Sequence, residues 1–148
     1  MPSYRYSEYS IETRDGTRKT IAIPVVEITV TTSSGRSLTM KALVDSAAPF
    51  CLFTRRAAND LGLAFSPASQ QSVNVLCSGG QHIAFRFPIR LHIDGWSSHA
   101  WNTNGWFFYN PWDLSPPLLG AICGNEGFIE QWHISLNRAR RYFTIEPP

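Results

Sequence analysis

The sequence predicts an all-β protein with one or two short helices. Apolar and polar residues alternate with a period of two over several segments, as in strands with one buried face. Turn-forming residues such as those at 33–36 separate these segments. The block from Ile83 to Ile93 alternates over its whole length, which predicts one long strand. Pro88 lies in the polar set of that block and indicates an edge position or a bulge.

The N-terminal third predicts two hairpins. Residues 4–13 and 19–23 flank an Asp-Gly turn and give the weaker signal. Residues 26–31 and 38–44 alternate around the turn at 33–36 and give the stronger one. The second strand of the stronger hairpin delivers Asp45 to a loop.

The middle of the chain predicts one helix and a third hairpin. Thr54 is a suitable N-cap for a short helix over 55–61, and Gly62 ends it. Residues 66–71 are polar and contain proline, which predicts a loop. Residues 73–76 can pair back onto the long strand across a glycine-containing tip.

The C-terminal third contains a segment rich in aromatic residues and a closing hairpin. We expect a strand over 106–109 within the aromatic segment, although the aromatic side chains could also form a partner surface. Residues 124–132 predict a short helix that an internal glycine weakens. Residues 133–136 and 142–145 form the closing hairpin.

Length and composition predict a single domain. The chain has 148 residues, of which 43% are hydrophobic, enough for a sizeable core. We expect residues 1–24 to form an N-terminal extension with strands and residues 25–148 to form the main domain. The net charge of +2 argues against a nucleic-acid partner, and the arginines at 138, 140 and 141 fit a solvated hairpin edge.

The sequence predicts a cytoplasmic protein without a metal or cofactor. The N-terminus lacks the apolar run of a signal peptide, and no stretch is long and apolar enough to span a membrane. The three cysteines and four histidines match no zinc pattern. Reduced, buried thiols are the expected state of the cysteines.

The strongest motif is the run Ala42-Leu43-Val44-Asp45-Ser46-Ala47-Ala48. An acidic residue at the end of a buried strand is costly unless its surroundings require it. The adjacent hydroxyl of Ser46 can fix its orientation, and the small residues Ala47 and Ala48 leave room for a substrate or a second chain. A local interpretation is also open, in which Asp45 forms an Asx-turn at a strand end.

Three landmarks follow one another at compatible spacings. The first is the Asp45 motif with its following helix, and the second is the glycine-tipped hairpin at 77–81. The third is Pro117-Leu118-Leu119-Gly120 with the Gly-Phe segment at 127–130. Together they resemble the cellular branch of the retropepsin-like aspartic protease family, whose loop reads Asp-Thr/Ser-Gly. The resemblance covers roughly 25–145 and implies a closed acid-protease barrel with a flap hairpin.

The resemblance also implies a mechanism and a set of site residues. A homodimer would pair the two Asp45 carboxylates, which share one proton and activate a water against a peptide bond. Ser46, Ala47 and Ala48 would support the catalytic loop. The flap tip would consist of Ser78, Gly79 and Gly80, and the substrate, a peptide or protein, would contact Phe50, Ile83 and Leu118. No cofactor, metal, nucleic acid or membrane is implied.

Two departures from the family pattern define the alternative. Ala47 replaces the family's glycine, and its methyl group could crowd the substrate or strain the turn. Residues 121–125 read as an insertion after the Leu-Leu-Gly signature. The alternative function is therefore a catalytically impaired dimerisation or peptide-binding module. Asp94-Gly95, a second acidic residue followed by glycine, predicts an ordinary hairpin turn.

Overall fold

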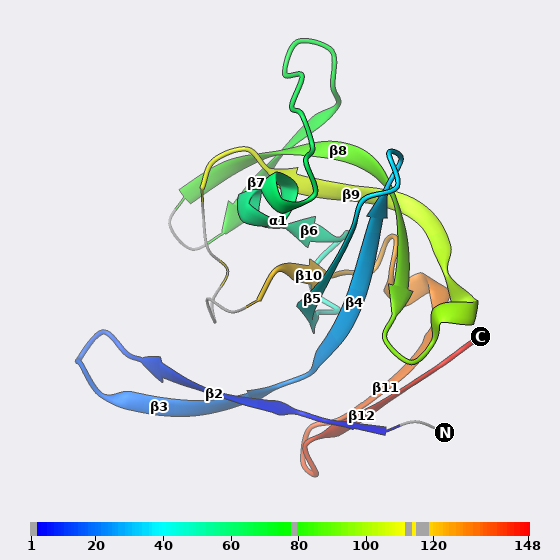
Figure 1. Cartoon of the computed structure of the whole chain (residues 1–148). Helices are drawn as coiled ribbons and strands as arrows, with labels where there is room; N and C mark the ends of the chain where they lie inside the picture. The colour runs from blue at the N-terminus through cyan, green and yellow to red at the C-terminus, as the bar shows by residue number, and fades with distance from the viewer. Residues whose placement is uncertain (1–2, 78–79, 112–113, 115–118) are drawn as a thin grey trace.

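The computed structural model describes residues 3–77, 80–111, 114 and 119–148. Its centre is a sheet with the strand order β4-β5-β10-β6-β9-β8-β7, which additional pairing between β4 and β8 closes into a barrel (Figure 1). The predicted all-β closed barrel is thus confirmed. The strands are β4 (Val25–Thr32), β5 (Ser37–Val44), β6 (Leu52–Phe53), β7 (Ser72–Cys77), β8 (Gly80–Ile93), β9 (Trp101–Phe108) and β10 (Ala121–Cys123).

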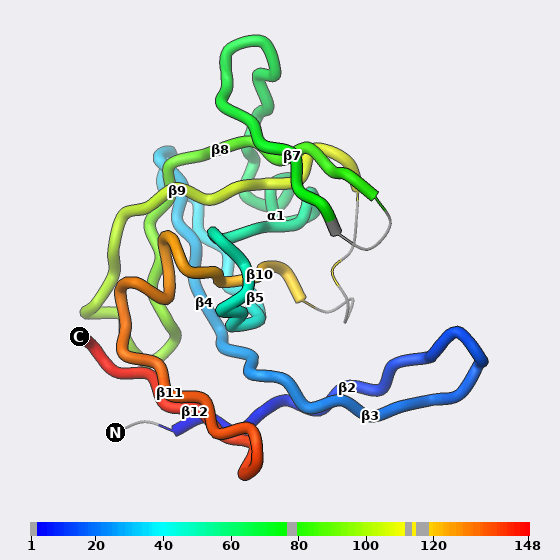
Figure 2. Tube along the Cα trace, turned by 180° about the vertical axis from the view of Figure 1, so that it is seen from behind, coloured from blue at the N-terminus to red at the C-terminus, as the bar shows by residue number. Residues whose placement is uncertain are grey.

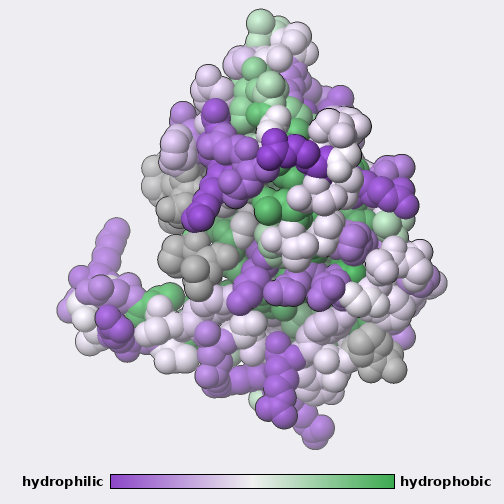
Figure 3. All heavy atoms as spheres, in the orientation of Figure 1, coloured by the Kyte–Doolittle hydropathy of each residue, from purple (hydrophilic) through white to green (hydrophobic). Residues whose placement is uncertain are grey.

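Two small sheets flank the barrel. In one, β1 (Ser3–Arg5) pairs with β12 (Tyr142–Glu146), which pairs with β11 (His133–Asn137). In the other, β2 (Ser7–Glu12) pairs only with β3 (Arg18–Ile23) among the described strands. The β2–β3 hairpin extends away from the body, on the same side as the β7–β8 hairpin (Figures 1 and 2). The space-filling view shows this arm standing clear of a surface on which polar and apolar side chains are mixed (Figure 3).

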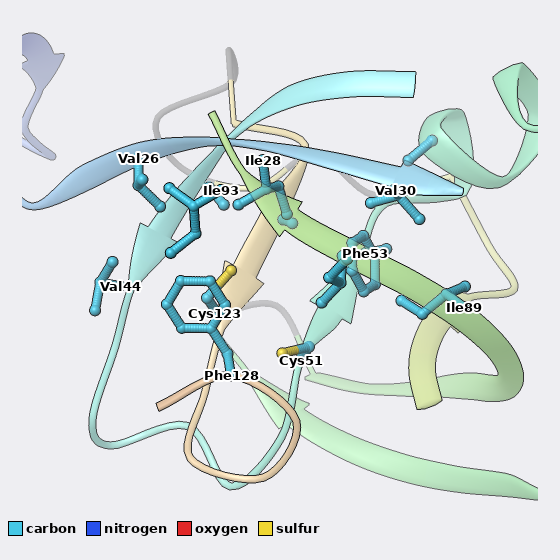
Figure 4. Close-up of a cluster of buried hydrophobic side chains, with 14 of the residues drawn as sticks. Val26, Ile28, Val30, Val44, Cys51, Phe53, Ile89, Ile93, Cys123 and Phe128 are labelled. Carbon is cyan, nitrogen blue, oxygen red and sulfur yellow. The ribbon is translucent and has the colours of Figure 1, made fainter. Parts of the chain in front are cut away.

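Alternation along the strands builds the core inside the barrel. Ile28 and Val30 of β4 and Ile93 of β8 are completely buried, whereas Glu27, which precedes Ile28 in β4, is exposed. Figure 4 shows these side chains directed toward a shared interior. Phe53 stacks on Phe107 with ring centroids 4.6 Å apart, which joins β6 to β9. Core packing therefore stabilises β6 and β10, the two shortest strands of the barrel, which lie in the middle of its sheet.

The helix α1 (Arg55–Asp60) confirms the capping prediction. The Thr54 hydroxyl accepts a hydrogen bond from the Ala57 amide at 3.1 Å, and Gly62 follows the helix with φ +68°. Two short 3₁₀ turns complete the described helices, η1 (Ser97–His99) and η2 (Ile129–Gln131). Within the described part of the chain, no helix has the length and apolar character needed to cross a membrane.

Two sequence predictions about element boundaries were wrong. The predicted helix over 124–132 is only the three-residue turn η2, because Gly127 has φ +89°, a backbone conformation outside the helix. The predicted strand at 106–109 is longer, since β9 begins at Trp101. The Trp101 indole donates to the Gly127 carbonyl at 2.7 Å, so this aromatic residue ties β9 to the turn before η2.

The Pro88 prediction is confirmed by the pairing of β8. On one edge of β8, Pro88 lies opposite Asn104 of β9. On the other edge of β8, the pairing with β7 ends at Phe85 and the pairing with β4 begins at Ile89. Pro88 lies in the interval between these partners, where the missing amide hydrogen costs no ladder bond. Asp94-Gly95 forms the predicted turn, in which the Trp96 amide donates to the Ile93 carbonyl at 2.8 Å.

Candidate active site

Asp45 directly follows β5, at the end where that strand leaves the core. The register of β5 turns Ala42 and Val44 inward, and both are buried. The Val44 amide donates to the Pro24 carbonyl at 2.9 Å, which fixes the end of the strand against the chain that enters β4. Asp45 itself is half-buried and Ser46 is exposed. The buried and hydrogen-bonded end of β5 therefore places the Asp45 carboxylate near the surface.

The carboxylate of Asp45 is held in one orientation by its own loop. The Ala47 amide donates to Asp45 Oδ1 at 2.9 Å, and the Ala48 amide donates to the Asp45 carbonyl at 3.2 Å. This is the Asx-turn that the local interpretation of the sequence described. The turn does not exclude a catalytic role, because it orients a carboxylate that remains partly accessible.

Ala47 fits this turn without backbone strain. Its φ is not in the left-handed region, where a side chain would be disfavoured, and the residue is exposed. The amide that holds Asp45 belongs to the main chain and is present in alanine as in glycine. Within one chain, the substitution therefore leaves the loop intact.

The segment from Cys123 to Glu126 supports the loop from behind. The Asp45 amide donates to the Cys123 carbonyl at 3.0 Å. Asn125 makes two contacts, its amide with the Ala48 carbonyl and its Nδ2 with the Ser46 carbonyl, both at 2.9 Å. At Gly124, a Cβ atom would lie 2.6 Å from the Ala48 carbonyl oxygen and still closer to that of Phe50. Only glycine allows the two backbones to approach so closely.

These contacts place a different segment behind Asp45 from the third landmark of the sequence. Residues 121–125, which the sequence suggested as an insertion, contain β10, and this strand pairs in parallel with β5 and antiparallel with β6. The hydrophobic-hydrophobic-glycine segment that packs behind Asp45 is Ile122-Cys123-Gly124. Leu118 lies outside the described residues. Sequence reasoning therefore missed Gly124 and Asn125, although the same local pattern was visible at 122–124.

The β7–β8 hairpin forms one wall beside the loop. Its strands pair up to Cys77 and Gly80, and Gly80 has φ +116°, while the predicted tip residues Ser78 and Gly79 lie outside the described residues. Val73 of this hairpin shares an apolar cluster with Phe50 and Trp106. The rings of Phe50 and Trp106 lie 5.3 Å apart.

A hollow of about 360 Å³ lies between this wall and the loop. Phe50, Val73 and Trp106 give it an apolar side, and Arg86 and Glu126 give it charged groups of opposite sign. Its remaining lining is polar and consists of Gln71, Ser72, Thr103 and Asn104. This hollow contains one of the three substrate contacts that the sequence suggested, Phe50.

Ile83 lies elsewhere. It pairs with Asn74, between the two valines of β7, and packs against the barrel core from the other face of the hairpin. A larger hollow of about 470 Å³ lies over β5 and α1, but its lining includes no residue of the loop at 45–50. Of these two hollows, only the smaller one is lined by a residue of the loop at 45–50, namely Phe50. Among the described residues, no group of three or more potential metal ligands is assembled.

Comparison with known proteins supports the fold. A retropepsin-like aspartic protease from Rickettsia conorii has a similar structure, with a TM-score of 0.56 and 15% sequence identity. The similarity covers 93% of this chain and 97% of that protein. No family model matches the sequence, and no curated protein sequence matches it. At this identity the similarity shows that the chain has the retropepsin-like fold.

Proposed function

We propose that this protein is a homodimeric aspartic endopeptidase in which Asp45 of each chain contributes half of the catalytic pair. The observation that carries the proposal is the Asp45 loop, a half-buried carboxylate oriented by the Ala47 amide at the end of a barrel strand. The retropepsin-like fold around it supports the same conclusion. One chain supplies one such loop, so the reaction requires two copies.

The chemistry follows from bringing two carboxylates together. At a separation of about 3 Å they cannot both ionise, so they hold one proton in common. The ionised member accepts a proton from a water molecule, which attacks the peptide carbonyl, and the protonated member donates to the carbonyl oxygen. Ser46, exposed beside Asp45, would tie the two loops together, and the β7–β8 hairpin would act as the flap.

Peptide cleavage by the purified protein tests this proposal. We expect hydrolysis of a peptide library under acidic conditions, with a bell-shaped pH profile because one proton must be shared. Asp45→Asn should abolish cleavage, whereas Asp94→Asn, the same change in the hairpin turn, should leave it unchanged. Cleavage that survives in Asp45→Asn, or a wild-type protein that remains monomeric at the concentrations of the assay, would refute the proposal.

The binding-module alternative is tested by Ala47→Gly. Because Ala47 has an ordinary φ and keeps the hydrogen bond to Asp45, we expect this change to alter the cleavage rate little. If the wild-type protein bound peptides without cleaving them and the Ala47→Gly variant cleaved them, the result would instead show that the methyl group impairs the site. Binding and cleavage are measured separately, by calorimetry with an uncleaved peptide and by mass spectrometry of products.

A further inference from the structure

Two buried cysteines lie opposite each other at the base of the Asp45 loop. The antiparallel register of β6 and β10 pairs Phe53 with Ala121 and Leu52 with Ile122, so its next step pairs Cys51 with Cys123. Opposed residues of antiparallel strands project from the same face of the sheet. Both side chains have no exposed surface, and Figure 4 shows them entering the same core from neighbouring strands.

The backbone at this position suits a covalent bridge. The Cys123 carbonyl accepts from the Asp45 amide at 3.0 Å, and the Cys51 carbonyl accepts from the Trp106 amide at 3.1 Å. The backbone carbonyl of each cysteine is therefore bonded to a third segment and not to the other cysteine, which makes Cys51 and Cys123 a non-hydrogen-bonded pair. Such pairs have Cα atoms about 4.5 Å apart. Disulfides span Cα separations of about 4.4 to 6.8 Å, so rotation of the side chains is enough to bring the sulfurs together.

We propose that Cys51 and Cys123 form an oxidisable dithiol site, which a small hydroperoxide converts into an intramolecular disulfide. The Cys51 sulfur attacks one peroxide oxygen and the O–O bond breaks, so that Cys51 becomes a sulfenic acid and one molecule of water or alcohol leaves. The Cys123 sulfur then attacks the sulfenic sulfur and displaces its hydroxyl group as water. Two thiols are oxidised, the peroxide is reduced, and a thiol reductant reverses the change.

The surroundings of the two sulfurs set the order of these steps. The adjacent Cys123 thiol lowers the pKa of Cys51, and burial raises the pKa of Cys123. Loss of the thiol proton, which creates the nucleophile, is therefore easier at Cys51 than at Cys123. Because both sulfurs are buried, we expect the first step to be slower than at an exposed thiol and the second step to follow at once.

The site is placed to affect the Asp45 loop. Cys51 is the residue after Phe50, and the Cys123 carbonyl holds the Asp45 amide. A bridge would link the two strands that carry these contacts. The inference concerns the two thiols alone and does not depend on peptide cleavage, so its test can succeed or fail independently of the proposed function.

The test uses Cys77→Ala, which keeps only the two cysteines in question. The folded protein is treated with hydrogen peroxide, free thiols are then alkylated in denaturant, and the products are identified by mass spectrometry of peptides. We expect a product with the mass of one chain less two hydrogen atoms, with no covalent link between chains, that takes up no alkylating agent and yields a peptide linking Cys51 to Cys123. Dithiothreitol should restore both thiols.

Matched controls make the result specific. Cys51→Ala and Cys123→Ala, each in the Cys77→Ala background, should form no intramolecular link, and alanine keeps the small apolar character of the site. Peroxide treatment in denaturant should convert a smaller fraction of the chains to this link, because the fold no longer holds the cysteines opposite each other when the sulfenic acid forms. Two free thiols after treatment, two separately oxidised cysteines, or a link that forms in the same proportion of chains in denaturant would each overturn the inference.

Discussion

Gly124→Ala tests whether the segment behind Asp45 positions the proposed catalytic loop. The new Cβ would lie 2.6 Å from the Ala48 carbonyl oxygen and closer still to that of Phe50. The distance of 2.6 Å to Ala48 is about 0.8 Å shorter than the 3.4 Å at which ordinary van der Waals contact begins. Because both neighbours are backbone atoms, the loop itself must shift. Overpacking of this kind costs about 1–3 kcal/mol. The melting temperature of a chain of this length should fall by about 2–4 °C for each kcal/mol.

The effect on cleavage should exceed the effect on stability. A displacement of roughly 1 Å at a catalytic group costs on the order of 100-fold in rate, so we expect a folded dimer with about that loss of kcat/KM. Gly120→Ala is the control, because its Cβ would meet the flexible Met40 side chain. Thermal unfolding and peptide cleavage are measured on both variants. A Gly124→Ala protein with unchanged cleavage would refute the argument that this close approach positions Asp45.

Three further outcomes follow from the contacts. Asn125→Ala releases the Ser46 carbonyl and should lower cleavage several-fold with little change in melting temperature, whereas a similar loss of both would indicate only a folding defect. Thr54→Ala removes the N-cap of α1 and should cost about 1 kcal/mol in urea unfolding, which Thr54→Ser should largely restore. Asp15 should titrate by NMR with a pKa of about 2, chiefly because the Thr13 hydroxyl donates to its carboxylate. The stability that this carboxylate contributes is present above its usual pKa of 3.8 and is lost as pH falls through about 2. Thr13→Val should raise the pKa of Asp15.

The parts of the fold that the sequence predicted are those encoded by neighbouring residues. The alternation in β4 and β5 and the capping of α1 by Thr54 depend on local periodicity and on contacts a few residues apart. The helix predicted at 124–132 failed for a reason that is also local, since Gly127 adopts a positive φ that the pattern of apolar residues does not reveal.

The candidate site was predicted only in part because its second half is defined by a distant contact. Asp45 was recognisable from the strand that precedes it. Two segments, 118–120 and 122–124, share the same hydrophobic-hydrophobic-glycine pattern, and nothing within either segment distinguishes them. The choice is made by packing, because Gly124 lies against the backbone of Phe50, some 70 residues earlier in the chain. A pattern of three residues cannot report such a contact.

The alanine at position 47 lies where the chain itself places no demand for glycine. A glycine is required where φ is positive or where another backbone approaches closely, and within this chain neither demand is observed at Ala47, which is exposed and has an ordinary φ. Gly124, in contrast, meets the demand for close approach on the inner side of the loop. Any remaining demand for glycine at position 47 must therefore come from outside the chain, from a substrate or from the loop of a second copy. The methyl group of Ala47 thus bears on the proposed dimer and its substrate, and the stability of the single chain should be indifferent to it.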